Sequence, residues 1–191
     1  IINKEFLFNF NFGDSIIIDQ IIKTVNEASE YDSTITTNNF LLGLLNIHLL
    51  GDLNKTTNLF KQYSQYNQND IRPYLILGEL YFKQKDYINA LSFFYRSNLI
   101  NPKQIEGQLY AGISMYYLGN YSDAIKKLTY ALELDEYNGI AKYYMGLSYL
   151  QLNQFTKSIT YFTESLLLNY ENDEVYYMLG LAYKKNNQKM Q

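Results

Sequence analysis

Several residue types that often carry chemistry are rare or missing in this sequence. There is no cysteine, which excludes a disulfide framework, a thiolate metal site and a cysteine nucleophile. His48 is the only histidine, so a metal site built from several histidines is excluded as well. We expect His48, which stands among leucines, to have a structural or surface role. The sequence therefore predicts no catalytic residue, no metal site and no cofactor.

Excess charge and long apolar runs are also scarce. The net charge is −3 and no basic stripe is present, which argues against a nucleic-acid partner. The longest apolar stretch, Phe40 to Gly51, is interrupted by Asn46 and is too short to span a bilayer, so we expect no membrane insertion. Two prolines and ten glycines are too few for a loop-rich β fold, whereas a hydrophobic content of 47% allows a substantial core. The lack of cysteine suits a reducing or an oxidising compartment and leaves the location open.

A repeat of 34 residues is the main positive feature of the sequence. Four glycines follow one another at this spacing, one in each repeat unit: Gly78, Gly112, Gly146 and Gly180. In the same register, a large apolar residue recurs at Phe94, Leu128 and Phe162, and a small residue recurs at Ala90, Ala124 and Ser158. Self-similarity at such a period is typical of repeat architectures, in which each unit packs on its neighbours.

Each repeat has the pattern of two helices. In the repeat from Ile71, apolar residues recur at i, i+3, i+4 and i+7, at Tyr74, Leu77, Gly78 and Tyr81. Lys85-Asp86 breaks this pattern, and a second apolar stripe follows through Ala90, Phe93, Phe94 and Ser97. Asn101-Pro102 predicts the end of the second helix, because proline disfavours helix in the residue before it. The small side chains at Gly78 and Ala90 let the two helices approach closely.

The motif Tyr74-x-x-Leu77-Gly78-x-x-Tyr81, followed by Asp86-Tyr87, Ala90, Phe94 and Pro102, resembles the signature of the tetratricopeptide repeat (TPR) family. The resemblance implies an all-α fold, a right-handed superhelical solenoid of antiparallel helix pairs. We divide the chain into 1–15, an N-terminal extended segment; 16–36, a helix of a diverged unit; 37–70, a degenerate repeat; 71–104, 105–138 and 139–172, three full repeats; and 173–191, the first helix of a further repeat or a capping helix.

The resemblance also implies a binding surface. In the family, the first helix of each unit lines a concave groove, through the second, fifth, ninth, twelfth and thirteenth residues. The residues we predict for a partner-binding groove are Leu75, Glu79, Phe82, Leu109, Ile113, Tyr116, Tyr117, Tyr143, Leu147, Leu150, Tyr177 and Leu181. The middle of this set is apolar and aromatic, and a large exposed apolar patch tends to mark an interaction site. Tyrosine suits such a site because it offers buried area and a polar tip.

Three interpretations of this row of residues stay open. A partner fills the groove, or the side chains pack between adjacent units, or the chain fills the groove itself, for example with Phe6 to Phe12. Family members that clamp a C-terminal carboxylate in the groove use lysine, arginine and asparagine, whereas the central places here hold leucine, isoleucine and tyrosine. We therefore do not expect a carboxylate clamp in the groove.

These observations predict a non-enzymatic protein–protein interaction module, an adaptor or scaffold that holds an apolar or aromatic peptide or helix of another protein. Two alternatives are a structural subunit of a large multiprotein assembly and the non-catalytic repeat region of a larger enzyme. Apolar and aromatic residues such as Tyr176, Tyr177 and Tyr183 would be poorly covered if the chain ended at Gln191, because terminal repeats normally need a polar face. We therefore expect further chain, self-association or a larger assembly at the C-terminal end.

Overall fold

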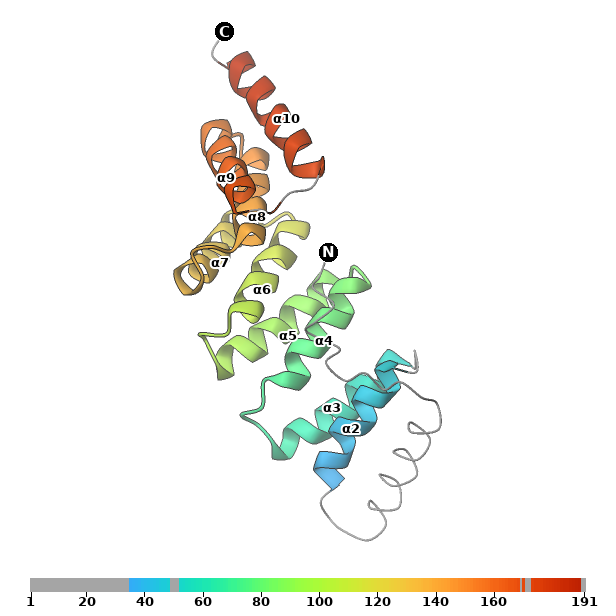
Figure 1. Cartoon of the computed structure of the whole chain (residues 1–191). Helices are drawn as coiled ribbons and strands as arrows, with labels where there is room; N and C mark the ends of the chain where they lie inside the picture. Colours follow the sequence, from blue (N-terminus) through green and yellow to red (C-terminus); the bar gives the residue numbers. More distant parts are fainter. Residues whose placement is uncertain (1–34, 49–51, 169, 171–172, 190–191) are drawn as a thin grey trace. The chain divides into compact units, whose positions relative to one another are not determined.

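The computed structural model describes residues 35–48, 52–168, 170 and 173–189 (Figure 1). Within these ranges the chain forms α-helices and no strand, which confirms the predicted all-α fold of helical repeats. The helices are α2 (Ile35–His48), α3 (Leu53–Tyr66), α4 (Arg72–Lys83), α5 (Tyr87–Ile100), α6 (Ile105–Tyr117), α7 (Tyr121–Leu134), α8 (Gly139–Gln151), α9 (Phe155–Leu167) and α10 (Asp173–Lys189). The predicted segment 1–15, and residues 16–34 of the predicted helix 16–36, lie outside the described residues.

The chain divides into two compact units, Ile1–Leu77 and Gly78–Gln191. In the first unit, α2 packs against α3. The Phe40 ring stacks on Phe60 with 5.4 Å between ring centroids and lies 5.0 Å from the ring of Tyr63. A Cβ at Gly43 would overlap the Phe60 ring, so glycine allows this close approach. The degenerate repeat thus keeps the packing of glycine on a large ring, although its glycine stands one place earlier than in the later repeats.

A polar cluster closes the end of the first unit. The Tyr63 hydroxyl donates a hydrogen bond of 2.6 Å to Asp70 Oδ2, and Arg72 Nη2 lies 2.6 Å from the same oxygen. Burial alone would raise the pKa of Asp70, but the hydrogen bonds from Arg72 and Tyr63 lower it below its ordinary value. The Arg72 guanidinium also lies 4.7 Å from the centre of the Phe40 ring. Arg72 is therefore held by its own unit.

In the second unit, helices follow one another as antiparallel pairs with short turns. The first helix of three successive pairs ends near a residue with positive φ, at Lys85 (62°), Gly119 (79°) and Asn153 (56°). These residues are 34 positions apart, and a left-handed residue after a helix is a common stop signal. Side-chain caps begin two of the helices: Asp86 accepts a hydrogen bond from the Asn89 backbone, and Asn138 accepts one from the Ala141 backbone.

Three of the repeated glycines, Gly78, Gly112 and Gly146, lie against large side chains of the following helix. A Cβ at Gly78 would come within 2.6 Å of the Phe94 ring, and a Cβ at Gly146 within 2.6 Å of the Phe162 ring. Phe94 and Phe162 are almost completely buried. The small residues that the repeat pattern predicts to allow close helix packing therefore stand at the tightest points of the core.

Candidate functional site

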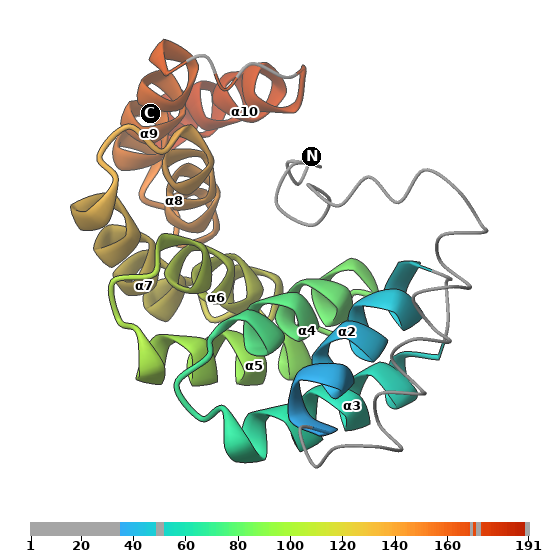
Figure 2. The same ribbon diagram turned by 60° about the horizontal axis from the view of Figure 1, so that its bottom comes forward.

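The first helices of successive repeats lie next to one another in the second unit. Helix α6 contacts α8, and α8 contacts α10, while α7 and α9 pack against their preceding first helices. Figure 2 shows α6 and α8 along one side of this unit, with α5, α7 and α9 along the other. The first helices therefore form one face, which we call the first-helix face.

The structure places the twelve predicted groove residues at different depths. Leu75 is a buried residue of the first unit, and the other eleven belong to the second. Six of these eleven are buried: Glu79, Leu109, Ile113, Tyr143, Leu147 and Leu150. Phe82, Tyr116 and Leu181 are partly exposed. Only Tyr117, at 45%, and Tyr177, at 67%, are exposed.

The buried members of the set take part in packing between helices. Leu109 and Ile113 of α6 belong to a hydrophobic cluster with Leu128 of α7 and Met145 of α8. A second cluster joins Tyr143, Leu147 and Leu150 of α8 with Phe162 of α9 and Val175 of α10. These side chains form the core beneath the first-helix face and hold its helices together. The prediction that they touch a partner stays a prediction.

Five aromatic residues form a connected group at one end of the first-helix face, and we call them the tyrosine cluster: Phe82, Tyr87, Tyr116, Tyr117 and Tyr144. Tyr117 stacks on Tyr87 with 4.5 Å between ring centroids and lies 5.9 Å from the ring of Phe82. The hydroxyls of Tyr117 and Tyr144 lie 3.0 Å apart, within hydrogen-bond distance. The rings come from α4, α5, α6 and α8, so the cluster joins two full repeats and the next first helix.

The hydroxyls of Tyr87, Tyr116 and Tyr144 stay neutral at physiological pH. Burial, followed by the hydrogen bond to Tyr117, raises the pKa of Tyr144 above its ordinary value. Burial and the neighbouring Tyr117 also raise the pKa of Tyr87, and burial with two tyrosine neighbours raises that of Tyr116. A neutral phenol both donates and accepts a hydrogen bond, so the cluster offers aromatic area and polar tips together.

Tyr87 and Tyr144 are not among the residues predicted for the groove. Tyr87 stands at the start of a second helix, and Tyr144 stands at the sixth place of its repeat, beside the groove positions. The recurrence of an aromatic residue at the place of Tyr87, in Tyr121 and Phe155, is the sequence signal that marks one of them. The juxtaposition of both with Tyr117 depends on the three-dimensional packing.

Glu79 is the one acidic residue of the predicted set, and its side chain is buried. Lys83 Nζ lies 3.0 Å from Glu79 Oε1, which makes an ion pair, although the geometry is not that of a hydrogen bond. The charge of Glu79 is thereby compensated within α4. We expect it to contribute to local structure more than to recognition of a charged partner.

Among the described residues, no group of three or more histidine, cysteine, aspartate or glutamate side chains has the arrangement of a metal site. In the same residues, no helix combines the length and the apolar character needed to cross a bilayer.

Similarities to known proteins agree with the repeat. Models of the tetratricopeptide repeat family match residues 71–104 and 111–164. A comparison with curated proteins finds no match. A crystal structure of MamA protein superposes with a TM-score of 0.75 at 20% sequence identity, over 82% of this chain and 85% of MamA.

Two other solved structures share the helix arrangement. MamA 41-end from Desulfovibrio magneticus RS-1 has a TM-score of 0.73 at 18% identity, over 82% of this chain and 88% of that one. The first TPR of Spaghetti (RPAP3), solved with the HSP90 peptide SRMEEVD, has a TM-score of 0.57 at 18% identity, over 60% of this chain and 90% of that one. Likeness at such identities establishes the fold alone.

The sequence spacing, the helix pairs and the family matches lead to one assignment. The two matched ranges include the repeated glycines at Gly78, Gly112 and Gly146 and the large residues packed on them. Tetratricopeptide repeats are protein-interaction modules built from stacked helix pairs. Residues 71–104 and 111–164 of this chain are tetratricopeptide repeats.

Proposed function

We propose that the chain is an adaptor or scaffold that holds an apolar or aromatic peptide segment, or a helix, of another protein against its first-helix face. One observation carries the proposal. Tyr117, a large aromatic residue, is 45% exposed in the middle of a connected aromatic group. Tyrosine and other aromatic residues are enriched at protein interfaces.

The twelve predicted residues divide into two roles under this proposal. The exposed or partly exposed ones, Phe82, Tyr116, Tyr117, Tyr177 and Leu181, would touch the partner. The buried ones, such as Leu109 and Leu147, would keep the first helices in register. The RPAP3 structure supports the general class, because that tetratricopeptide repeat domain was solved with a bound peptide.

The test begins with peptides selected on the wild-type chain from a random phage-displayed library. A labelled selected peptide is then titrated by fluorescence anisotropy against Tyr117→Ser and against Tyr137→Ser. Tyr137 is a matched control, since it is 70% exposed in the turn before α8 and lies outside the tyrosine cluster. We expect selected peptides rich in apolar and aromatic residues, and about a tenfold or larger loss of affinity for Tyr117→Ser alone.

Two outcomes would contradict the proposal. One is that no peptide sequence is enriched over the unselected library. The other is that both variants bind the selected peptide as the wild type does. Circular dichroism of Tyr117→Ser checks that the fold is intact, which its exposed position leads us to expect.

A second candidate function is that of a structural subunit in a larger assembly, including self-association. It is favoured by the exposed aromatic residues Tyr176 and Tyr183 on α10. Sedimentation velocity over a range of concentrations tests self-association. A concentration-dependent increase in mass that disappears in the double variant Tyr176→Ser with Tyr183→Ser would favour this candidate. A mass that stays that of the monomer at all concentrations would exclude self-association.

A further inference from the structure

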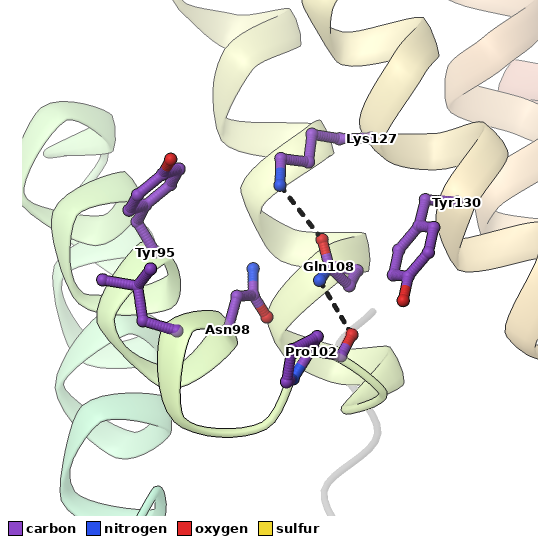
Figure 3. Close-up of a pocket in the computed structure, with 7 residues that line it drawn as sticks. Tyr95, Asn98, Pro102, Gln108, Lys127 and Tyr130 are labelled. Atoms are coloured by element: carbon purple, nitrogen blue, oxygen red, sulfur yellow. Dashed lines mark hydrogen bonds between the residues drawn. The ribbon is translucent and has the colours of Figure 1, made fainter.

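A cavity of about 270 Å³ opens between α5, α6 and α7 and shares no residue with the tyrosine cluster (Figure 3). Its walls include Tyr95 and Asn98 of α5, Pro102 of the following turn, Gln108 of α6, and Lys127 and Tyr130 of α7. Most of these residues come from second helices or the turn that follows them, so the cavity is separate from the proposed partner surface on the first helices.

The Asn98 side chain is the unusual element of this cavity. It is 7% exposed, and neither Nδ2 nor Oδ1 has a hydrogen-bond partner among the described residues. A Cβ at Gly107 would overlap Asn98 Oδ1, so the absence of a side chain there lets this oxygen rest against α6. Figure 3 shows Nδ2 directed into the space between Tyr95 and Lys127. Buried amide groups in native proteins are nearly always paired, so this unpaired donor points to a missing acceptor.

A cation lies beside the unpaired amide. Lys127 Nζ donates a long hydrogen bond of 3.3 Å to Gln108 Oε1 and lies 5.5 Å from the centre of the Tyr95 ring. Gln108 is held in turn by a hydrogen bond of 2.9 Å from its Nε2 to the Pro102 carbonyl oxygen. No carboxylate is among the described residues that line the cavity, and Lys127 forms no ion pair with a described residue. The ammonium group keeps free donors that face the same space as Asn98 Nδ2.

The corresponding junction of helices in the next repeat contains a lysine and a carboxylate of the chain itself. The residues 34 positions after Gln108 and Tyr130 are Lys142 and Glu164. Lys142 Nζ lies 2.5 Å from Glu164 Oε2, so a lysine meets a carboxylate at the equivalent junction of helices. In the cavity, Gln108 and Tyr130 stand at the places of this lysine and carboxylate, and the cation is Lys127, which comes from a different position of the repeat. The cavity therefore contains a lysine without a carboxylate among its lining residues, whereas the next junction contains both groups.

We propose that this cavity binds a carboxylate of a partner protein, with Lys127 Nζ and Asn98 Nδ2 as the donors and the rings of Tyr95 and Tyr130 beside its aliphatic stem. A charge-assisted hydrogen bond from lysine to a carboxylate is stronger than one between neutral groups. The volume is slightly below the range of ordinary small-molecule pockets, about 300–1,000 Å³, and suits one acidic side chain or one chain terminus.

The test follows the side-chain amide signals of Asn98 and the Cε signals of Lys127 by NMR in the full chain. Sodium acetate is titrated first, with acetamide and inorganic phosphate as controls at matched ionic strength. N-acetylglutamate N-methylamide and N-acetylalanine then separate a side-chain carboxylate from a C-terminal one. We expect saturable shifts with acetate, none with acetamide, and a lower midpoint for one of the two amino-acid derivatives.

Substitutions of Lys127 and Asn98 test the two proposed donors separately. Lys127→Met removes the charge and keeps the aliphatic stem, and we expect the acetate midpoint to rise about tenfold or more, as loss of a charge-assisted hydrogen bond predicts. Lys126→Met is the matched control, because Lys126 is exposed and paired with Asp123 outside the cavity. Asn98→Leu removes an unpaired amide, so we expect a folded protein with weakened acetate binding.

The proposal is overturned if acetate causes no saturable shift at Asn98 or Lys127. Equal shifts with acetamide or phosphate would also overturn it, because they would show no preference for a carboxylate. The same conclusion follows if Lys127→Met and Lys126→Met change the acetate midpoint equally. None of these readouts depends on Tyr117, so a failure here is distinguishable from a failure of the proposed function.

Discussion

Helices α8 and α10 carry the same sequence motif in two different surroundings. Tyr143, Gly146 and Leu147 of α8 correspond to Tyr177, Gly180 and Leu181 of α10, 34 residues later. Tyr143 is 2% exposed, whereas Tyr177 is 67% exposed. A Cβ at Gly146 would overlap Phe162, but a Cβ at Gly180 would have no heavy atom of the described residues within 4 Å.

The difference in exposure between α8 and α10 comes from their neighbouring helices and not from the motif. Ser148 and its counterpart Ala182 are both completely buried, because that side of each helix faces the preceding repeat. The other side of α8 is covered by α9, through residues such as Phe162. In a repeat protein, each helix pair contributes one half of every interface, so the same residue is core or surface according to its neighbours.

The largest expected effect that tests this comparison is a pair of truncations, Tyr143→Ala and Tyr177→Ala. We expect Tyr143→Ala to lower the free energy of unfolding by about 3–5 kcal/mol, because it removes a buried ring whose centroid lies 5.8 Å from that of the Phe162 ring. Tyr177→Ala should change it by about 0.5 kcal/mol or less, as is usual for an exposed residue. Urea unfolding followed by circular dichroism measures both.

Similar losses for the two variants would contradict the comparison, because they would mean that something covers Tyr177 as well. A second measurement then separates the causes. If the loss at Tyr177 grows with protein concentration, the cover is another copy of the chain, and if it does not, the cover belongs to the same molecule.

The helices themselves could be predicted from the sequence because their stop signals are local. The turns containing Lys85, Gly119 and Asn153 recur every 34 residues, and each has the left-handed backbone that ends a first helix. Asn101 and Asp135, which end second helices, show the same spacing. The close contact of glycine with a large residue was also predictable, since both positions repeat together at Gly78 and Phe94.

The depth of the groove residues and the cavity could not be predicted in the same way. Leu147 and Leu181 have identical places in the repeat, but only Leu147 is buried. The cavity depends on Asn98 and Lys127, which come from different repeats and have no matching residue in the next one, where Leu132 and Tyr161 stand. Such features arise where the repeat is broken, so periodicity gives no signal for them.

The stability of the covered helix α6 depends on pH through Tyr110. Burial, followed by the charges of Glu79 and Glu106, raises the pKa of Tyr110 to about 12. Because tyrosine titrates near 10 in an unfolded chain, the neutral phenol contributes stability that is complete below about pH 10 and is lost as the pH rises through about 12. Helix α10 has Met178 at the corresponding place, so this alkaline sensitivity belongs to the covered helices.

The measurement is the free energy of unfolding of the wild type and of Tyr110→Phe between about pH 9 and pH 12. We expect the free energy of unfolding to fall by about 2–3 kcal/mol more for the wild type than for Tyr110→Phe over this range. This corresponds to a difference of about two units between the pKa of Tyr110 in the folded and in the unfolded chain. Parallel curves for the two proteins would show that Tyr110 ionises as easily in the folded chain as in the unfolded one.

The smallest expected effect, and the one with opposite signs in the two helices, comes from Gly146→Ala and Gly180→Ala. In α8 the new methyl group must displace the buried Phe162 ring, and overpacking of this kind costs about 1–3 kcal/mol. In α10 the methyl group meets no heavy atom of the described residues within 4 Å, so the better helix propensity of alanine should stabilise the chain by about 0.5–1 kcal/mol. Thermal and urea unfolding should therefore move in opposite directions for two substitutions at the same place in the repeat. If Gly180→Ala also destabilises the protein, then α10 has a neighbour at this face in solution, and its exposed tyrosines belong to an interface.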